Sequence, residues 1–399
     1  MLKICVVAQR VPFPPNKGEK LRTYHQIERL TQLGYQVEVL TLLESEKDKE
    51  NVSALESHLN IRVTACKLAS KARRYSWALL KGQPISVGAF YSEALQGALN
   101  QRLASNCDVV LLTASSLGYY IFESSEYGTT NCHILMDFMD VDSDKWKQYA
   151  TSTKWPMRYI YQRESNKIRK LEKQACAEFL QTYLIADEEV SLFRRQVTDA
   201  KPVKVLGNGL DFDAFYPALS PPNNAAPHFL FTGVMDYKPN VDAVVWFVKS
   251  CWPKIISRFP DAIFTIAGMN PIAEVNTLAS VDGVKVTGFV DDILPCFHEA
   301  DTFVAPFRLA RGVQNKVLQA AACKLPIVTT SMGAEGIAFA SPSSMWIEDN
   351  ENAFAQACIN TIENRIESTS RATSAYEAIR AEYSWEQQLK PLEVTLSSL

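Results

Sequence analysis

The chain has 399 residues, which is more than one ordinary hydrophobic core accommodates, so we expect two domains. Hydrophobic residues make up 47% and charged residues 21%, as in an ordinary soluble globular protein. The 41 basic and 44 acidic side chains give a net charge of −3, which offers no electrostatic support for a nucleic-acid partner. Nine cysteines are scattered without a C-x-x-C pair, which argues against a disulfide framework or a zinc site.

The N-terminal sequence MLKICVVAQR runs directly into an apolar stretch that is too short for a signal peptide. No later apolar run reaches the length that spans a membrane. We therefore expect a cytoplasmic protein, with surface contact at the inner face of the membrane as the alternative.

Short apolar runs in the first half predict buried parallel strands. These strands are expected at 2–8, 36–42, 61–68, 108–113, 133–136 and 180–186, with a helix over 19–33 between the first two and one or two polar helices over 149–177. This β-α-β alternation is typical of an α/β fold with Rossmann-like topology. The absence of a G-x-G-x-x-G motif disfavours a dinucleotide-dependent dehydrogenase.

Two segments of the first half combine basic residues with other features of a binding surface. The loop over 9–20 is kept extended by prolines and places Gly18 just before a helix, so it predicts either a phosphate- or sugar-binding loop or a rigid connector. The segment over 71–81 mixes basic, aromatic and aliphatic residues. It predicts either contact with an anionic membrane surface or a helix with a solvated basic side.

Four carboxylates follow the predicted strand at 133–136, within the sequence DFMDVDSD. The D-x-D formed by Asp140 and Asp142 is compatible with a metal site, because hard cations prefer carboxylate oxygens. A second interpretation is an acceptor site, in which a carboxylate accepts a hydroxyl proton. The third is simple capping of the following helix by Ser143 or Asp144.

The strand–helix alternation starts again after a Pro- and Asn-rich linker at 219–227. Strands are expected at 229–232, 262–267, 284–287, 302–306 and 325–330, with a helix beginning at Val241. Two of these strands end at Gly233 and Gly288, which allow a ligand to approach the backbone or simply form turns. Because the carboxyl ends of parallel strands share one edge, we expect the ligand there.

The stretch over 302–330 combines a strand, a loop with Arg308 and Arg311, and a helix whose first turn is 313–316. The start of a helix attracts anions through its free N–H groups and its dipole. Asn315, Lys316 and Gln319 are three or four residues apart and share one face of this helix. This face predicts contact with a phosphate and a sugar hydroxyl. A lone lysine would more often be a solvated helix residue, but at Lys316 the basic loop, the glycine and the strand edge converge and favour a ligand.

Taken together, these segments resemble the retaining family 4 glycosyltransferases of the GT-B fold, in particular the subgroup associated with bacterial exosortase and exopolysaccharide loci. The resemblance spans nearly the whole chain. It is carried by PFPPNKGEKLR at 12–22, MDFMDVDSDKW at 136–146, FTGVMDYKPNVDA at 231–243, RGVQNKVLQAA at 311–321 and SWEQ at 384–387.

The resemblance implies two Rossmann-like domains that face a cleft. Residues 1–205 would form the acceptor-side domain, residues 206–383 would bind the nucleotide sugar, and residues 384–399 would cross back as a helix to the first domain. The implied reaction transfers a sugar from a nucleotide-diphosphate sugar to a hydroxyl of a glycan or lipid-linked acceptor, with retention and without a metal or other cofactor. The implied process is the synthesis of exopolysaccharide or another cell-surface glycan.

The resemblance also implies roles for individual residues. The diphosphate would be held by Gly233, Lys238, Lys316 and the helix start at 311–315, which includes Arg311, Gly312 and Asn315, so that Lys316, Lys238 and Arg311 assist catalysis. Asn240 belongs to the donor motif, Gly288, Phe289 and Val290 would pack near the base, Gly18 would close over the phosphates, and Arg22, Asp137, Asp140 and Asp142 would face the acceptor. The sequence departs from the wider family at Gln319 and Arg311, where glutamates are common, and at Met235, where an arginine is common.

Three other functions are compatible with the sequence. A nucleotide-sugar epimerase has a similar architecture but needs acid and base groups in one cleft, and the five histidines form no obvious cluster in the sequence. A non-catalytic nucleotide-sugar-binding protein would fit the departure at Gln319. A metal-dependent GT-A transferase that uses Asp140 and Asp142 is the third.

Overall fold

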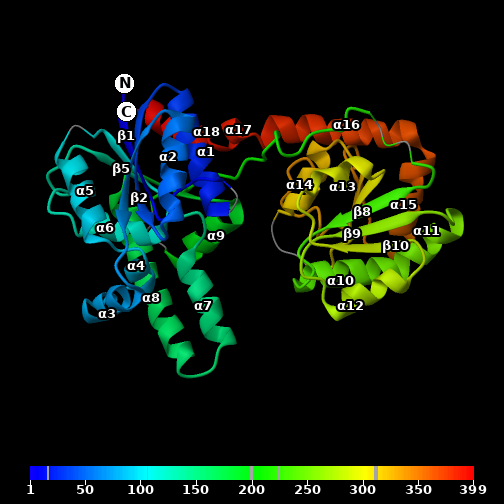
Figure 1. Ribbon diagram of the computed structural model, residues 1–399, viewed down its shortest axis with the longest axis horizontal. Coiled ribbons are helices and arrows are strands. Elements are labelled where there is room, and N and C mark those ends of the chain that lie inside the picture. The colour runs from blue at the N-terminus through cyan, green and yellow to red at the C-terminus, as the bar shows by residue number, and fades with distance from the viewer. Residues whose placement is uncertain (16–17, 106, 198–200, 221, 223, 310–312) are drawn as a thin grey trace. The chain divides into compact units, whose positions relative to one another are not determined.

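The computed structural model describes residues 1–15, 18–105, 107–197, 201–220, 222, 224–309 and 313–399, and the chain forms two compact units. Unit 1 comprises Met1–Gly209 and Gln388–Leu399, and unit 2 comprises Leu210–Gln387. Each unit contains a parallel sheet with helices on both of its faces (Figure 1). The predicted α/β class with two Rossmann-like sheets is therefore confirmed.

The sheet of unit 1 has seven parallel strands in the order β3-β2-β1-β4-β5-β6-β7. Its strands are β1 (Lys3–Ala8), β2 (Gln36–Leu43), β3 (Arg62–Lys67), β4 (Val109–Leu112), β5 (His133–Asp137), β6 (Gln181–Leu184) and β7 (Lys204–Val205). The central strand β1 is almost entirely buried, as expected for a strand that is covered by helices on both sides.

The helices of unit 1 connect and cover these strands. They are α1 (Gly18–Gln32), α2 (Lys47–Leu59), α3 (Lys71–Leu80), α4 (Ile85–Ala89), α5 (Glu93–Ala104), α6 (Gly118–Phe122), α7 (Asp142–Ser152), α8 (Met157–Glu178), α9 (Asp187–Gln196) and α18 (Lys390–Ser397). After α1 ends, Gly34 adopts a φ of 84°, a left-handed conformation that glycine accepts without strain.

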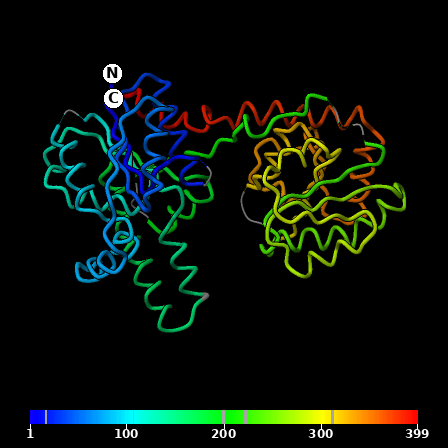
Figure 2. The backbone as a smooth tube through the Cα atoms, in the orientation of Figure 1, coloured from blue at the N-terminus to red at the C-terminus, as the bar shows by residue number. Residues whose placement is uncertain are grey.

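The C-terminal helix α18 packs on unit 1, which confirms that the chain end crosses back to the first domain. The backbone trace in Figure 2 shows both chain termini in this unit. The Arg29 Nε atom of α1 lies 2.7 Å from Glu393 Oε1, and Lys204 Nζ donates to Thr395 Oγ1 at 3.1 Å. These contacts join α18 to α1 and to the residue that begins β7.

The sheet of unit 2 has six parallel strands in the order β10-β9-β8-β11-β12-β13. Its strands are β8 (His228–Thr232), β9 (Ile263–Ala267), β10 (Val284–Gly288), β11 (Thr302–Ala305), β12 (Ile327–Thr329) and β13 (Trp346–Ile347). The strand order reverses between β8 and β11, and parallel sheets bind ligands at such a point, beyond the carboxyl ends of the strands.

The helices of unit 2 bury its sheet on both faces. They are α10 (Lys238–Trp246), α11 (Trp252–Arg258), α12 (Ala273–Asn276), α13 (Leu294–Glu299), α14 (Asn315–Ala322), α15 (Glu351–Glu363), α16 (Arg365–Glu382) and, at the boundary with unit 1, α17 (Trp385–Gln388). Aromatic side chains dominate the core: Phe247 packs against Phe264 with ring centroids 4.6 Å apart and contacts Trp252 at 6.1 Å.

The ends of the predicted strands lie within two residues of the observed ends, but three helix starts differ. Where one or two polar helices were expected over 149–177, α7 begins seven residues earlier, at Asp142, because acidic residues such as Asp142 and Asp144 favour the first turn of a helix. Helix α10 begins at Lys238, three residues before the predicted Val241, because a proline such as Pro239 is tolerated in the first helical turn. Helix α14 begins at Asn315 because Gln314 is extended and Val313 packs against the hydrophobic core of unit 2. The two-residue strands β7 and β13 are too short to produce a recognisable apolar run.

A buried ion pair joins α1 and β5 to the segment that follows β7. Arg22 is 1% exposed and Asp137 is 0% exposed, and the guanidinium donates to both carboxylate oxygens at 2.6 and 3.0 Å. The same guanidinium also binds the side chain of Asn208 at 2.8 Å and the backbone carbonyl of Leu206. Gln26 Nε2 donates to Asp137 at 2.6 Å, so the carboxylate is well satisfied.

We predict that Arg22→Met lowers the free energy of unfolding by about 3–5 kcal/mol, because it leaves the Asp137 carboxylate buried without its charge partner. Urea unfolding of the native chain and the variant measures this difference. The double variant Arg22→Met/Asp137→Asn removes the orphaned charge and should recover part of the loss. A cost below about 1 kcal/mol for the single substitution would contradict a structural role for the pair.

Candidate active site

Lys316 lies in the first turn of α14, beyond the carboxyl end of β11. Its Nζ atom donates to Asn240 Oδ1 at 2.6 Å. The ammonium also lies 5.1 Å from the ring centroid of Phe231 and 4.8 Å from that of Phe307, so two aromatic faces flank the charge. The lysine therefore points toward the sheet edge at the switch point rather than into solvent.

The charge of Lys316 has no counter-charge in the described part of the chain. No described carboxylate forms an ion pair with it, and its hydrogen-bond partner Asn240 is neutral. Burial lowers the pKa of this ammonium to about 8, because an apolar environment disfavours the charged form. At neutral pH the group is still mostly protonated, so the site holds a half-buried positive charge that an anion would stabilise.

Glycine is required beside Lys316 because the backbone approaches closely there. A Cβ atom on Gly233 would lie 2.7 Å from Asn240 Nδ2 and 3.2 Å from Lys316 Nζ. Gly268 has a φ of +145°, and a Cβ atom there would lie 1.7 Å from the carbonyl oxygen of Gly233. The Gly268 N–H in turn donates to the carbonyl of Gly288 at 3.1 Å. The Gly233 N–H donates to the carbonyl of Ala267 at 3.0 Å. These two hydrogen bonds join the ends of β8, β9 and β10 into one glycine-lined edge.

Asn240 orients Lys316 from the first turns of α10. Its side chain is 4% exposed, and its Nδ2 atom donates to the carbonyl of Val234 at 2.9 Å. This bond directs Oδ1 toward the ammonium. Asn240 was predicted to bind the donor, and the geometry gives it a positioning role through Lys316.

The start of α14 offers further groups for an anion. Among the described residues, neither the Asn315 N–H nor the Lys316 N–H has a hydrogen-bond partner. The Asn315 side chain is exposed, and the half-buried Gln319 side chain likewise has no partner in the described part of the chain. The predicted site residues Arg311 and Gly312 lie outside the described residues.

The other predicted donor residues that the structure describes in unit 2 lie at the same carboxyl edge of the sheet, where Lys238 and Phe289 are exposed. Lys238 is the first residue of α10 and has no described partner. Gly288 ends β10 with a φ of 68°, the half-buried Val290 lies two residues beyond it, and Phe289 is 66% exposed. Arg308 differs from Lys238, because its guanidinium is already paired with an acidic side chain: it donates to both oxygens of Asp242, at 2.6 and 3.1 Å.

Three residues that shape this site carry no signal in the sequence pattern. Gly268 directly follows the expected strand at 262–267, but only its conformation and the close backbone contact explain why glycine is needed there. Phe231 lies 85 residues before Lys316 in the chain, so its contact with the ammonium leaves no local signal. Phe307 lies nine residues before Lys316, and its contact depends on the path of the loop between them.

In unit 1, the predicted acceptor-side residues fall into two groups. Arg22 and Asp137 are buried against each other, so we assign them a positioning role rather than direct contact with a ligand. Asp140 and Asp142 are partly exposed and share Lys145, whose Nζ atom lies 2.6 and 3.6 Å from them. Gly18 is exposed as the first residue of α1, and its neighbours 16 and 17 lie outside the described residues.

The negative charge of Asp140 and Asp142 after β5 is compensated by hydrogen bonds and by Lys145. Burial raises the pKa of Asp142, and the nearby Asp140 carboxylate adds to this, whereas Lys145 and the hydrogen bond from Ser115 oppose it. Burial also raises the pKa of Glu172 to about 8, although its carboxyl accepts the Ser143 N–H at 3.0 Å. Across the described ranges, no group of three or more His, Cys, Asp or Glu side chains could hold a metal ion.

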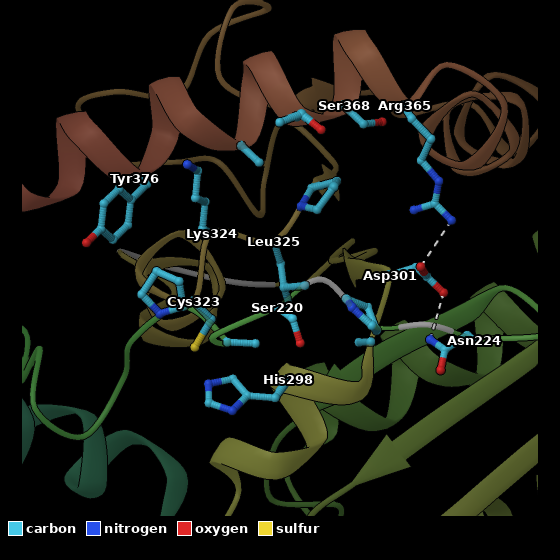
Figure 3. Close-up of a pocket in the computed structure, with 17 residues that line it drawn as sticks. Ser220, Asn224, His298, Asp301, Cys323, Lys324, Leu325, Arg365, Ser368 and Tyr376 are labelled. Atoms are coloured by element: carbon cyan, nitrogen blue, oxygen red, sulfur yellow. Dashed lines mark hydrogen bonds and ion pairs between the residues drawn. The ribbon is translucent and has the colours of Figure 1, made fainter.

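A separate cavity of about 770 Å³ lies near the amino ends of β11 and β12. Figure 3 shows Asp301 in this cavity between two donors: its carboxylate accepts from Arg365 at 3.1 Å and from Asn224 at 3.0 Å. Asp301 also accepts the backbone N–H of His228 at 2.9 Å. Its carboxylate is thus satisfied within the protein, in contrast to Lys316.

No helix in the described ranges is both long and apolar enough to cross a membrane.

We predict that Asn240→Asp raises the pKa of Lys316 well above 8, because a carboxylate would replace the neutral amide 2.6 Å from the ammonium. The pH dependence of amine labelling at Lys316, followed by mass spectrometry, measures this change. Labelling requires the neutral amine, so it should be half-maximal near pH 8 in the native chain and at higher pH in the variant. Equal midpoints in both proteins would contradict the assigned contact.

Comparison with known proteins agrees with this architecture. Residues 226–364 match the family described as "Glycosyl transferases group 1". Over 403 aligned residues the chain is 24% identical to an "Uncharacterized 44.6 kDa protein in cps region" of Klebsiella pneumoniae, covering 96% of this chain and 97% of that protein.

Among solved structures, Anabaena Alr3699/HepE in complex with UDP-glucose matches with a TM-score of 0.64 and 13% identity, covering 100% of both chains. Sucrose-phosphate synthase from Thermosynechococcus elongatus matches with a TM-score of 0.63 and 14% identity, covering 100% of this chain and 99% of that one. At these identities the structural matches establish the fold. The two Rossmann-like sheets are typical of the GT-B fold, and the family match over residues 226–364 shows that most of unit 2 is similar to the group 1 glycosyltransferases.

Proposed function

We propose that the chain transfers a sugar from a nucleotide-diphosphate sugar to a hydroxyl of a glycan or lipid-linked acceptor, with retention of the anomeric configuration. The observation that carries this proposal is the half-buried Lys316 ammonium, which lacks a described counter-charge beside the glycine-lined strand edge. A diphosphate is the kind of anion that such an edge accommodates, because its oxygens can reach both the ammonium and the N–H groups at the start of α14.

The chemistry of the departing diphosphate explains why these groups would matter. The bond between the anomeric carbon and the diphosphate oxygen breaks, and the electron pair stays on that oxygen. Lys316 and the start of α14 would stabilise the developing negative charge, with Lys238 as a further exposed cation at the same edge. Arg311 and Gly312, predicted to share this role, remain part of the proposal.

Retention is proposed to use the leaving group itself as the base. The acceptor oxygen would form its bond to the anomeric carbon on the face that the diphosphate leaves, and its proton would pass to a diphosphate oxygen. No nucleophile from the protein is needed in this scheme, and the positive charge is supplied by side chains and a helix start.

The remaining donor contacts follow the predicted arrangement. Gly233 would let the diphosphate approach the backbone, and Asn315 and Gln319 would face the donor from α14. Gly288, Phe289 and Val290 would pack near the base, where the exposed ring of Phe289 offers a stacking surface. Uridine is the first base to consider, since the Anabaena protein was solved with UDP-glucose and with UDP.

On unit 1, Asp140 and Asp142 are proposed to face the acceptor, and Gly18 the donor phosphates. Surface contact with a membrane would bring a lipid-linked acceptor near, with the segment 71–81 as one candidate. The relative from the cps region of Klebsiella pneumoniae supports a role in capsule or exopolysaccharide synthesis. It offers no support for the narrower exosortase-associated subgroup.

The test is to measure release of nucleoside diphosphate from UDP-, GDP- and ADP-sugars in the presence of glycan and lipid-linked acceptors. Turnover is expected with one base, and Lys316→Ala should lower kcat by about 100- to 1,000-fold, because one charge-stabilising group is lost. Lys285→Ala removes an exposed lysine within β10 of the same unit and should leave turnover unchanged.

Other outcomes distinguish the competing functions. Binding of the nucleotide sugar without release would indicate a non-catalytic binding protein, and conversion of the donor sugar without an acceptor would indicate an epimerase. Full turnover in Lys316→Ala would exclude the proposed role of this lysine. Loss of turnover on adding a chelator would contradict the metal-free scheme.

A further inference from the structure

The hairpin formed by α7 and α8 projects from the rest of unit 1 (Figure 1). Between its base and its tip, three aromatic rings hold the two helices together: Trp146 lies 5.8 Å from Tyr149 and 5.6 Å from Tyr161, centroid to centroid. Ser165 Oγ also donates to the carbonyl of Ser143 at 2.7 Å, close to the start of α7. The two helices are therefore fixed against each other.

The tip of this hairpin, residues 153–159, carries large side chains that the protein leaves in solvent. Trp155 is 83% exposed and Tyr159 is 71% exposed, and Met157 between them is 39% exposed. Isolated exposed hydrophobic residues are common, but a tryptophan and a tyrosine at the end of a projecting hairpin form a local apolar surface that suits an interaction.

The charged side chains around the tip, from residue 145 to residue 163, are all basic. Between Lys145 and Arg163 the sequence contains no Asp or Glu, although the whole chain has more acidic than basic residues. Lys147, Lys154 and Arg158 are exposed along this stretch, and no described carboxylate pairs with them. The tip is thus a basic surface with aromatic side chains on a chain whose net charge is −3.

A second apolar segment lies beside the hairpin. Leu79 and Leu80 at the end of α3 are 55% and 89% exposed, and the basic residue Lys81 follows them. Arg163 Nη2 on α8 donates to the carbonyl of Gln83 at 3.0 Å, which ties the end of α3 to the hairpin. The exposed leucines add aliphatic surface next to the basic hairpin.

We propose that the tip of the α7–α8 hairpin docks on an anionic lipid surface, with the end of α3 beside it. Trp and Tyr favour the boundary between water and lipid because each ring combines an apolar body with a polar group. Lys147, Lys154 and Arg158 would face the anionic headgroups. Lysine is depleted at protein–protein interfaces, whereas Lys147 and Lys154 lie here beside interfacial aromatic residues, which favours a lipid surface over a protein partner.

This inference deepens the proposed peripheral contact of the glycosyltransferase, but its test needs neither donor nor acceptor. Purified chain is sedimented with phosphatidylcholine vesicles that contain or lack phosphatidylglycerol, at low and high salt. Binding is expected only with the anionic vesicles and should weaken as salt increases. Failure of this binding is therefore distinct from failure of sugar transfer.

Two variants test the two components of the surface. Lys154→Ala/Arg158→Ala should weaken partition into anionic vesicles by about 25-fold, or about fivefold for each lost base. Trp155→Ala/Tyr159→Ala should also weaken partition, even though the charge is unchanged. The control variants Lys173→Ala, at an exposed lysine nearer the other end of α8, and Ile366→Ala, which is 87% exposed in unit 2, should bind as the native chain does.

Three results would overturn the proposal. The first is equal binding to vesicles with and without phosphatidylglycerol, or to neither. The second is unchanged partition of both tip variants. The third is self-association of the native chain in analytical ultracentrifugation that the Trp155→Ala/Tyr159→Ala variant abolishes, which would assign the tip to a second copy of the chain.

Discussion

The half-buried ammonium of Lys316 is the constraint on which the rest of unit 2 depends. Burying a cation beside two phenylalanine rings is unfavourable, and the only described hydrogen-bond acceptor for it is the amide oxygen of Asn240. A bound anion would offset this free-energy cost, so we infer that a ligand, and not the protein alone, stabilises the charged lysine. The glycines at the strand ends would help such an anion to bind, because they leave free the space beside the lysine that a side chain would otherwise fill.

In unit 1, unlike at Lys316, the charged side chains of the predicted site are paired with opposite charges within the protein. Arg22 and Asp137 are buried as a satisfied pair, and Asp140 and Asp142 share one lysine. A site whose charges already compensate one another is suited to a neutral ligand such as a sugar hydroxyl, and not to a diphosphate. This contrast supports the proposed division of labour, in which unit 2 binds the donor and unit 1 faces the acceptor.

The strands could be predicted from the sequence because buried parallel strands produce continuous apolar runs, as in Ile4–Ala8 and Phe229–Phe231. Lys316 could be predicted because a loop, a helix start and a strand end coincide in one short stretch. The roles of Asn240, Arg22 and Phe231 could not be derived from local patterns, because each depends on a contact with a residue far away in the chain. A polar side chain near a strand end can equally contact a ligand or orient another residue, and only packing distinguishes the two.

The most direct test of the central claim is the pKa of Lys316 itself, measured by NMR with carbon-labelled lysine. The signal is assigned by its loss in Lys316→Arg. The account predicts a value near 8 in the free protein and a clear increase when uridine diphosphate binds, because the bound anion favours the charged form. A value near 10.4 in the free protein, or one that the nucleotide leaves unchanged, would contradict the claim that this lysine is held without a counter-charge for a diphosphate.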